Sequence, residues 1–175
     1  MYTNDYDFVG INAVKILLVN DEGKILLTQE PENFTWMPLH WGLPGGKATN
    51  KESLFETFER KCASDIGQKL KIEGIYRIME LIQEKRTIFM YIVVAKTNSS
   101  MVSGDAKEYK WVGKEDVENM MVSDFTEFYN KEMLIEFLSG KQNIVSPDIV
   151  STLPYYSMAK NSEYTAWLKS GKRNE

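Results

Sequence analysis

A glycine-rich segment that runs into a predicted helix is the part of this sequence best suited to chemistry. The segment 42–46 contains Gly42, Gly45 and Gly46 together with Pro44, so it favours a shaped loop over a regular element. Backbone amides at a helix N-terminus lack partners within the helix, and the helix dipole favours an anion beside them. The segment therefore indicates either a phosphate-binding site, with Gly45 and Gly46 as substrate-binding residues, or a turn of the chain that binds no ligand.

The residues after this segment predict the helix. Thr49 and Glu52 have the spacing of a capping box, which predicts a helix start near Thr49, and Gly67 is placed to end the helix. Apolar residues at helical spacing form one face: Leu54, Phe55, Phe58, Cys62 and Ile66. The opposite face is polar: Ser53, Thr57, Arg60, Lys61 and Ser64, with Asp65 at its margin.

The spacing of Gly46, Glu52, Arg60 and Gly67 resembles the Nudix box, G-x(5)-E-x(7)-R-E-U-x-E-E-x-G-U, where U is a bulky aliphatic residue. The resemblance implies an α/β fold, in the form of an α/β/α sandwich with a mixed β-sheet. It also implies cleavage of a nucleoside diphosphate linked to another moiety. In the family, the glutamates of the box hold Mg²⁺ or Mn²⁺, and glutamates spaced in this way project onto one helix face.

The sequence departs from the box at its metal-binding positions. Lys61, Ser64 and Asp65 stand where the family has three glutamates, so two carboxylates are replaced. An ammonium group on this face repels a divalent cation. Two hypotheses follow from the resemblance: a Nudix hydrolase with weak or altered hydrolysis, or a catalytically inactive Nudix domain that serves as a nucleotide-ligand sensor or protein-interaction module.

Other carboxylates could complete a depleted metal site. Asp105 and Glu108 lie in a region where many Nudix enzymes place an additional metal or catalytic carboxylate. The resemblance thus predicts Asp65 and Glu108 as catalytic residues and Asp65, Asp105 and Glu108 as metal ligands. The cofactor is Mg²⁺ or Mn²⁺ for an active enzyme, and an inactive protein needs none.

Arg60 and Lys61 are the predicted substrate-binding side chains of the helix. Arg60 in the family braces the glycine loop, and here a structural pair with Glu56 or Glu52 is an alternative. Lys61 is either a solvated helix lysine or a replacement for the missing metal that contacts a diphosphate directly.

Strands and a second helix are expected around this segment. A hairpin is predicted from Ile11–Val19 and Lys24–Gln29, because Asn20–Gly23 supplies turn residues. Further strands are predicted at Ile72–Ile82, Thr87–Thr97 and Glu108–Val112, the second of them apolar enough to be central and buried on both faces. A helix is predicted over Phe125–Ser139, opened by Asp124 with Glu127 as its capping partner and closed at Gly140.

Composition narrows the class of protein. The chain has 175 residues, a net charge of −4, one cysteine and one histidine. These counts exclude an internal disulfide and a Cys/His zinc site, and the charge offers no global attraction to nucleic acid or to an anionic membrane. The longest apolar run, Ile88–Ala95, is too short to span a bilayer. We expect a cytoplasmic protein with a nucleotide-like small-molecule partner and no nucleic-acid or membrane partner, and a homodimer is left open.

The chain is expected to contain one domain with an extension. Residues 1–146 form the predicted Nudix-like domain. Residues 147–175 form a C-terminal extension, and its apolar residues, Tyr155, Tyr156 and Trp167 among them, predict that it packs on the same domain.

Overall fold

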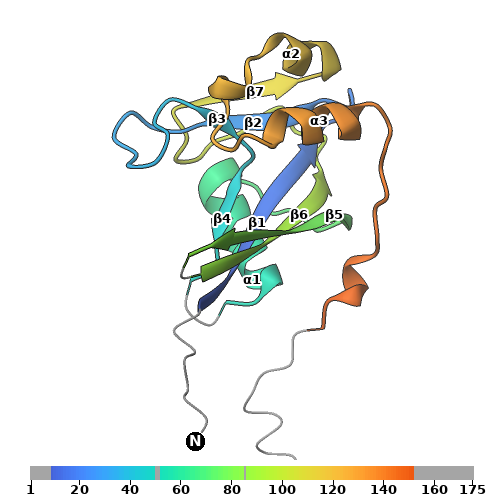
Figure 1. The fold of residues 1–175 in the computed structure, drawn as a ribbon. Helices are drawn as coiled ribbons and strands as arrows, with labels where there is room; N and C mark the ends of the chain where they lie inside the picture. Colours follow the sequence, from blue (N-terminus) through green and yellow to red (C-terminus); the bar gives the residue numbers. More distant parts are fainter. Residues whose placement is uncertain (1–8, 50–51, 85, 152–175) are drawn as a thin grey trace, which may run out of the picture.

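A mixed seven-stranded sheet forms the centre of the computed structural model, which describes residues 9–49, 52–84 and 86–151 (Figure 1). The strand order is β3-β2-β1-β6-β5, with β4 paired to β1 and β7 paired to β2. The strands are β1 (Val9–Val19), β2 (Ile25–Gln29), β3 (Trp41–Gly42), β4 (Gly45–Lys47), β5 (Gly74–Gln83), β6 (Arg86–Lys96) and β7 (Glu108–Val112). The helical elements are α1 (Leu54–Lys61), the π-helical turn η1 (Cys62–Ile66), α2 (Lys114–Asn119), η2 (Val122–Asp124), α3 (Asn130–Leu138) and η3 (Pro147–Ile149).

The central strand pair is parallel. Strand β1 pairs with β6 from Val9↔Arg86 to Val19↔Lys96, whereas β5 pairs with the other edge of β6 in the antiparallel direction. Strand β6 therefore lies between two neighbours and is buried on both faces, which confirms the prediction made from its apolar sequence.

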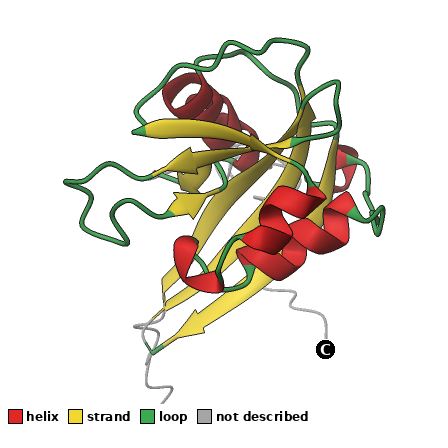
Figure 2. Cartoon of the chain, turned by 90° about the horizontal axis from the view of Figure 1, so that it is seen from above, coloured by secondary structure: helices red, strands yellow, loops and turns green. Residues whose placement is uncertain are grey.

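Helices cover both faces of the sheet (Figure 2). On one face Leu54, Phe58, Cys62 and Ile66 of α1 and η1 pack against β1 and β6. On the other, Met133, Leu134 and Phe137 of α3 close a second core cluster. The predicted α/β/α sandwich with a mixed sheet is thus confirmed. Among the residues that the structure describes, no helix is long and apolar enough to cross a membrane.

Helix α1 begins later than its first capping signal predicts. Its N-cap is Ser53, whose side chain accepts a hydrogen bond from the Glu56 amide at 3.2 Å, while Glu56 accepts one from the Ser53 amide at 2.7 Å. The prediction of a start near Thr49 is wrong. The Thr49 amide does donate to Glu52 at 2.8 Å, but the helix begins with the next box along the chain. Gly67 ends η1 with φ 72°, as predicted.

The glycine-rich segment is more regular than predicted, because it completes the edge of β1. Strand β2 pairs with β1 only at Val19↔Ile25, which leaves most of that edge free. Strand β4 fills it, and Gly45, Gly46 and Lys47 pair with Lys15, Val14 and Ala13. Gly42 likewise pairs with Thr28 of β2. The glycines therefore form two short strands rather than a free loop.

The second predicted helix is shorter than Phe125–Ser139. Helix α3 begins at Asn130, and Phe125 is buried before it. The predicted cap is wrong because the Glu127 carboxylate is held by Lys15, while Asp124 accepts a hydrogen bond from the Met121 amide at 2.7 Å. The end at Gly140, with φ 81°, is confirmed. Helix α2 is not among the predicted elements.

Candidate functional site

Arg60 connects helix α1 both to Glu52, in the segment before the helix, and to β4. Arg60 donates from Nε to Glu52 Oε1 at 2.7 Å and from Nη2 to Glu52 Oε2 at 2.9 Å. The same Nη2 donates to the Lys47 carbonyl at 3.0 Å. The hydrogen bond from Arg60 holds the pKa of Glu52 well below its usual range. Of the two structural pairs considered for Arg60, the one with Glu52 is confirmed and the one with Glu56 is wrong, because Glu56 caps the helix.

Both oxygens of Asp65 are occupied by protein donors. Oδ1 accepts hydrogen bonds from Lys61 Nζ at 2.7 Å and from Ser64 Oγ at 2.6 Å, and Oδ2 accepts one from the Gly45 amide at 2.9 Å. The Lys61 and Asp65 side chains are only 19% and 16% exposed. Lys61 is thus not a solvated surface lysine, and its ammonium lies against the one carboxylate that remains at the three metal-binding positions of the box.

These residues do not fit a divalent cation. Mg²⁺ and Mn²⁺ require several oxygen ligands, and no three Asp, Glu, His or Cys side chains within the described ranges lie close enough to share an ion. The Asp105 amide donates to the Ser64 carbonyl at 3.0 Å, but its side chain is exposed. Glu108 begins β7 opposite Gln29 and is also exposed. Metal binding by Asp65, Asp105 and Glu108 stays a prediction that this arrangement does not favour.

A second ion pair, which the sequence does not predict, lies on the other side of β4. Lys15 of β1, opposite Gly45 in the sheet, places Nζ 3.0 Å from Glu127 Oε1. Glu127 also accepts hydrogen bonds from Thr126 Oγ1 and from Asn130 Nδ2. Burial alone would raise the pKa of Glu127, but Lys15 and these donors together lower it. The sequence feature that could have indicated this ion pair is Lys15, the one charged residue in the apolar stretch Ile11–Val19.

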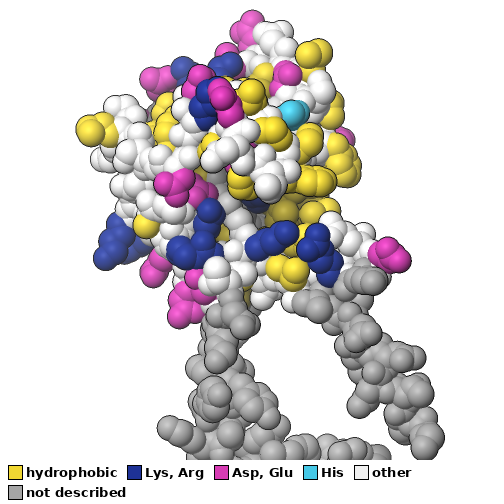
Figure 3. Space-filling view, turned by 90° about the vertical axis from the view of Figure 1, so that its left-hand side faces the viewer, with side chains coloured by type: hydrophobic (Ala, Val, Ile, Leu, Met, Phe, Trp, Pro, Cys, Tyr) yellow, Lys and Arg dark blue, Asp and Glu magenta, His cyan; other side chains and the backbone are white. Residues whose placement is uncertain are grey.

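Glu30 lies within electrostatic range of both ion pairs. Burial raises the pKa of Glu30, the negative charges of Asp65 and Glu127 raise it further, and Lys15 and Lys61 oppose them. These five residues form what we call the charged cluster: Lys15, Glu30, Lys61, Asp65 and Glu127. Acidic and basic side chains are interspersed over the face of the molecule drawn in Figure 3, so no large surface of one sign is seen there.

The raised pKa of Glu30 predicts a dependence of stability on pH. A carboxyl whose pKa is higher in the folded state stabilises the fold while it is protonated and loses this contribution as the pH rises through its folded pKa. Glu30→Gln is therefore expected to raise the melting temperature at neutral pH and to have little effect below the ordinary glutamate value of about 4.3. Thermal unfolding over a pH series measures this.

Glu32→Gln is the matched control, because it lies in the same segment and Lys107 lowers its pKa. It should not raise the melting temperature at neutral pH. Equal effects of the two substitutions at all pH values would contradict the environment described for Glu30.

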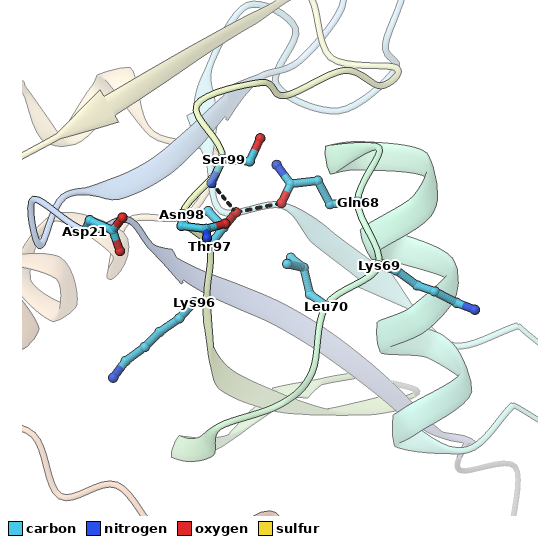
Figure 4. A pocket seen from close by; sticks show the side chains of 8 residues that line it. All are labelled: Asp21, Gln68, Lys69, Leu70, Lys96, Thr97, Asn98 and Ser99. Carbon is cyan, nitrogen blue, oxygen red and sulfur yellow. Dashed lines mark hydrogen bonds between the residues drawn. The ribbon is translucent and has the colours of Figure 1, made fainter.

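Gln68 follows Gly67, at a position where the Nudix box has an aliphatic residue. Both ends of its side-chain amide are hydrogen-bonded. Nε2 donates to the Met101 carbonyl at 2.6 Å, and Oε1 accepts from Thr97 Oγ1 at 2.8 Å. A pocket of about 580 Å³ lies beside these bonds (Figure 4). Its two lysines, Lys69 and Lys96, point away from each other. The Gln68 bonds thus fix the segment after β6, and the lysines do not converge on a ligand.

A mixed sheet with helices on both faces, whose glycine strand β4 is tied to helix α1 by Arg60, defines the Nudix class of fold. The sequence model of the NUDIX domain family matches residues 11–133 of this chain. The chain belongs to this family. A comparison with curated proteins found no significant match.

Solved structures agree on the fold. The chain is similar to a MutT protein from Methanosarcina mazei Go1, with 23% identity, a TM-score of 0.63, and coverage of 75% of this chain and 94% of that one. It is also similar to a NUDIX hydrolase from Nitrosomonas europaea, with 14% identity, a TM-score of 0.66, and coverage of 83% and 98%. A third is an Ap4A hydrolase from C. elegans, with 17% identity, a TM-score of 0.56, and coverage of 75% and 97%. Identities this low support the shared fold alone.

Proposed function

We propose that this Nudix protein binds a phosphate-bearing, nucleoside-diphosphate-like ligand at β4 and hydrolyses it weakly or not at all with a divalent metal. The observation that carries the proposal is the 2.7 Å ion pair between Lys61 Nζ and Asp65 Oδ1. A divalent ion at Asp65 would have to displace this ammonium or lie beside it, and either outcome is electrostatically unfavourable. The residues of the box therefore support binding better than metal-assisted hydrolysis.

Two lysines beside the glycines support an anionic ligand. Lys15 pairs with Gly45 across the sheet, and a Cβ added to Gly46 would lie 3.0 Å from Lys61 Cε. Gly46 thus leaves room for the Lys61 side chain along β4. Each of these lysines pairs with one carboxylate. The phosphate group of a ligand could replace that carboxylate as the charged partner of the lysine.

Calorimetry tests the proposal with ADP and nucleoside diphosphate sugars, in EDTA and in Mg²⁺ or Mn²⁺. We expect similar affinity in both conditions and no metal-stimulated hydrolysis. Lys15→Ala and Lys61→Ala should each weaken binding, whereas Lys69→Ala, an exposed lysine outside the cluster, should not. Metal-dependent turnover that Glu108→Gln or Asp105→Asn reduces would overturn the proposal in favour of the hydrolase. Absence of binding to all compounds would leave a protein-interaction role instead.

Restoring a carboxylate at position 61 should create a response to metal. Lys61→Glu places a second carboxylate one helical turn before Asp65, so the repulsion between the two is expected to lower the melting temperature in EDTA. Bound Mn²⁺ then stabilises the variant, by about 1.4 kcal/mol at ten times its dissociation constant. Thermal unfolding with and without Mn²⁺ measures this.

Lys61→Gln is the matched variant, because it removes the ammonium without adding an anionic ligand. It should not gain the response to Mn²⁺. A wild-type protein that Mn²⁺ already stabilises would show that Lys61 does not exclude the metal.

A further inference from the structure

The β5–β6 hairpin presents an apolar surface that nothing covers in the part of the chain that the structure describes. Ile78 and Ile82 of β5 are 53% and 77% exposed. They alternate with Met79 and Leu81, which pack on the core cluster that α3 closes. Because side chains alternate along a strand, Ile78 and Ile82 project from the opposite face of the sheet, the face that carries α1.

Strand β6 widens this surface. Ile78 pairs with Tyr91 and Glu80 pairs with Phe89, so these side chains share one face. Tyr91 and Phe89 are each half-buried. We call the group of Ile78, Glu80, Ile82, Phe89 and Tyr91 the hairpin surface. It contains four large apolar or aromatic residues and one carboxylate.

The described chain ends on the same face of the sheet. After α3, Val145 forms an antiparallel bridge with Ile75 at the edge of β5, with N–O distances of 2.9 and 3.0 Å. The chain then passes through η3, and Val150 packs against the core cluster that Tyr91 also contacts. This segment therefore runs past the edge of β5 from α3 towards the α1 side (Figure 1). It brings the end of the described chain, residue 151, to the face that carries the hairpin surface.

The sequence beyond this point has the length and pattern to cover that surface. Tyr164, Trp167 and Leu168 have the i, i+3, i+4 spacing of one apolar helix face. A helix over residues 162–171 would be about 15 Å long, close to the roughly 13 Å that the Ile78–Ile82 segment spans. Residues 152–161 can reach up to about 33 Å, which is longer than the Ile78–Ile82 segment. The segment also carries four basic residues against two acidic ones, and the hairpin surface has Glu80: Lys160, Lys169, Lys172 and Arg173, against Glu163 and Glu175.

We propose that residues 152–175 dock in cis on the hairpin surface, with Tyr164, Trp167 and Leu168 against Ile78, Ile82 and Phe89. The inference is independent of the proposed ligand site, which lies at β4. It makes the C-terminal extension a structural part of the domain, held across the outer half of β5 and β6.

Hydrogen–deuterium exchange on the full chain tests the docking, together with sedimentation velocity at several protein concentrations. We expect residues 162–171 to be protected in the wild-type monomer. Ile78→Ser/Ile82→Ser should speed their exchange about tenfold or more, because two exposed apolar contacts are lost without any change to the core. Trp167→Ala/Leu168→Ala should in turn speed exchange in β5. Phe128→Ser is the control, since Phe128 is 78% exposed and lies just before α3, the helix on the other face of the sheet; it should change neither.

Three results would overturn the proposal. Residues 162–171 could exchange at the rate of an unprotected peptide in the wild type. Their protection could persist in Ile78→Ser/Ile82→Ser, which would place the segment elsewhere. It could also rise with protein concentration together with a dimer, which would make a second copy the occupant.

Discussion

Gly45→Ala is expected to lower the free energy of unfolding by more than about 3 kcal/mol. Gly45 has φ 139°, a region that L-residues rarely adopt. A Cβ at this position would lie 2.1 Å from the Val14 carbonyl oxygen and 2.9 Å from Lys15 Cα. Both are backbone atoms of the central strand, so β4 would have to separate from β1. Denaturant unfolding measures the loss.

Gly23→Ala is the matched control. Gly23 also has a left-handed conformation, φ 73°, but nothing lies within 4 Å of an added Cβ. It should cost only about 1 kcal/mol, the conformational part of the penalty. Similar losses for the two substitutions would show that the close approach of β4 to β1 contributes little.

Asp65→Ala is expected to lower the free energy of unfolding by about 2 to 3 kcal/mol. The substitution leaves the Lys61 ammonium largely buried without its counter-ion and removes the acceptor of the Gly45 amide. Lys61→Met should recover part of the loss in the double variant, because an apolar side chain needs no partner there. A double-mutant cycle by denaturant unfolding measures the coupling of the two residues.

Glu59→Ala, which changes an exposed glutamate of α1, the helix that leads into η1, should change stability little. If Asp65→Ala were equally mild, Asp65 would have no structural role and a metal ligand would again be the better interpretation. The prediction also bears on activity assays, because loss of function in Asp65→Ala can arise from loss of the fold.

Much of the fold could be predicted from local pattern. The apolar runs of β1 and β6 and the short strand Glu108–Val112 follow from side-chain periodicity, which depends only on neighbouring residues. The ion pair between Glu52 and Arg60 could be predicted, because both residues lie in the Nudix box at fixed spacing. Which of the two successive capping boxes starts the helix could not be predicted, because Glu52 binds the side chain of Arg60, eight residues later.

The charged cluster could not be predicted, since its members come from distant segments. Lys15 meets Glu127 only in the folded chain, because one lies in β1 and the other just before α3. Local pattern alone assigns Glu127 to a helix cap. The strand formed by Gly45 and Gly46 could not be predicted either. It depends on a free edge of β1, which is known only once the strand pairing is known.

The long parallel pairing of β1 with β6 has a consequence for the synthesis and folding of the chain. Val9 at the start of β1 pairs with Arg86, which is synthesised much later. At roughly 5–20 residues per second, the ribosome takes on the order of ten seconds to synthesise the interval. During that time the edge of β1 that later pairs with β6 is unpaired, because β2 and β4 lie along the opposite edge. In refolding experiments, closure of the same large loop should set the rate, which places this protein among slow folders for its size.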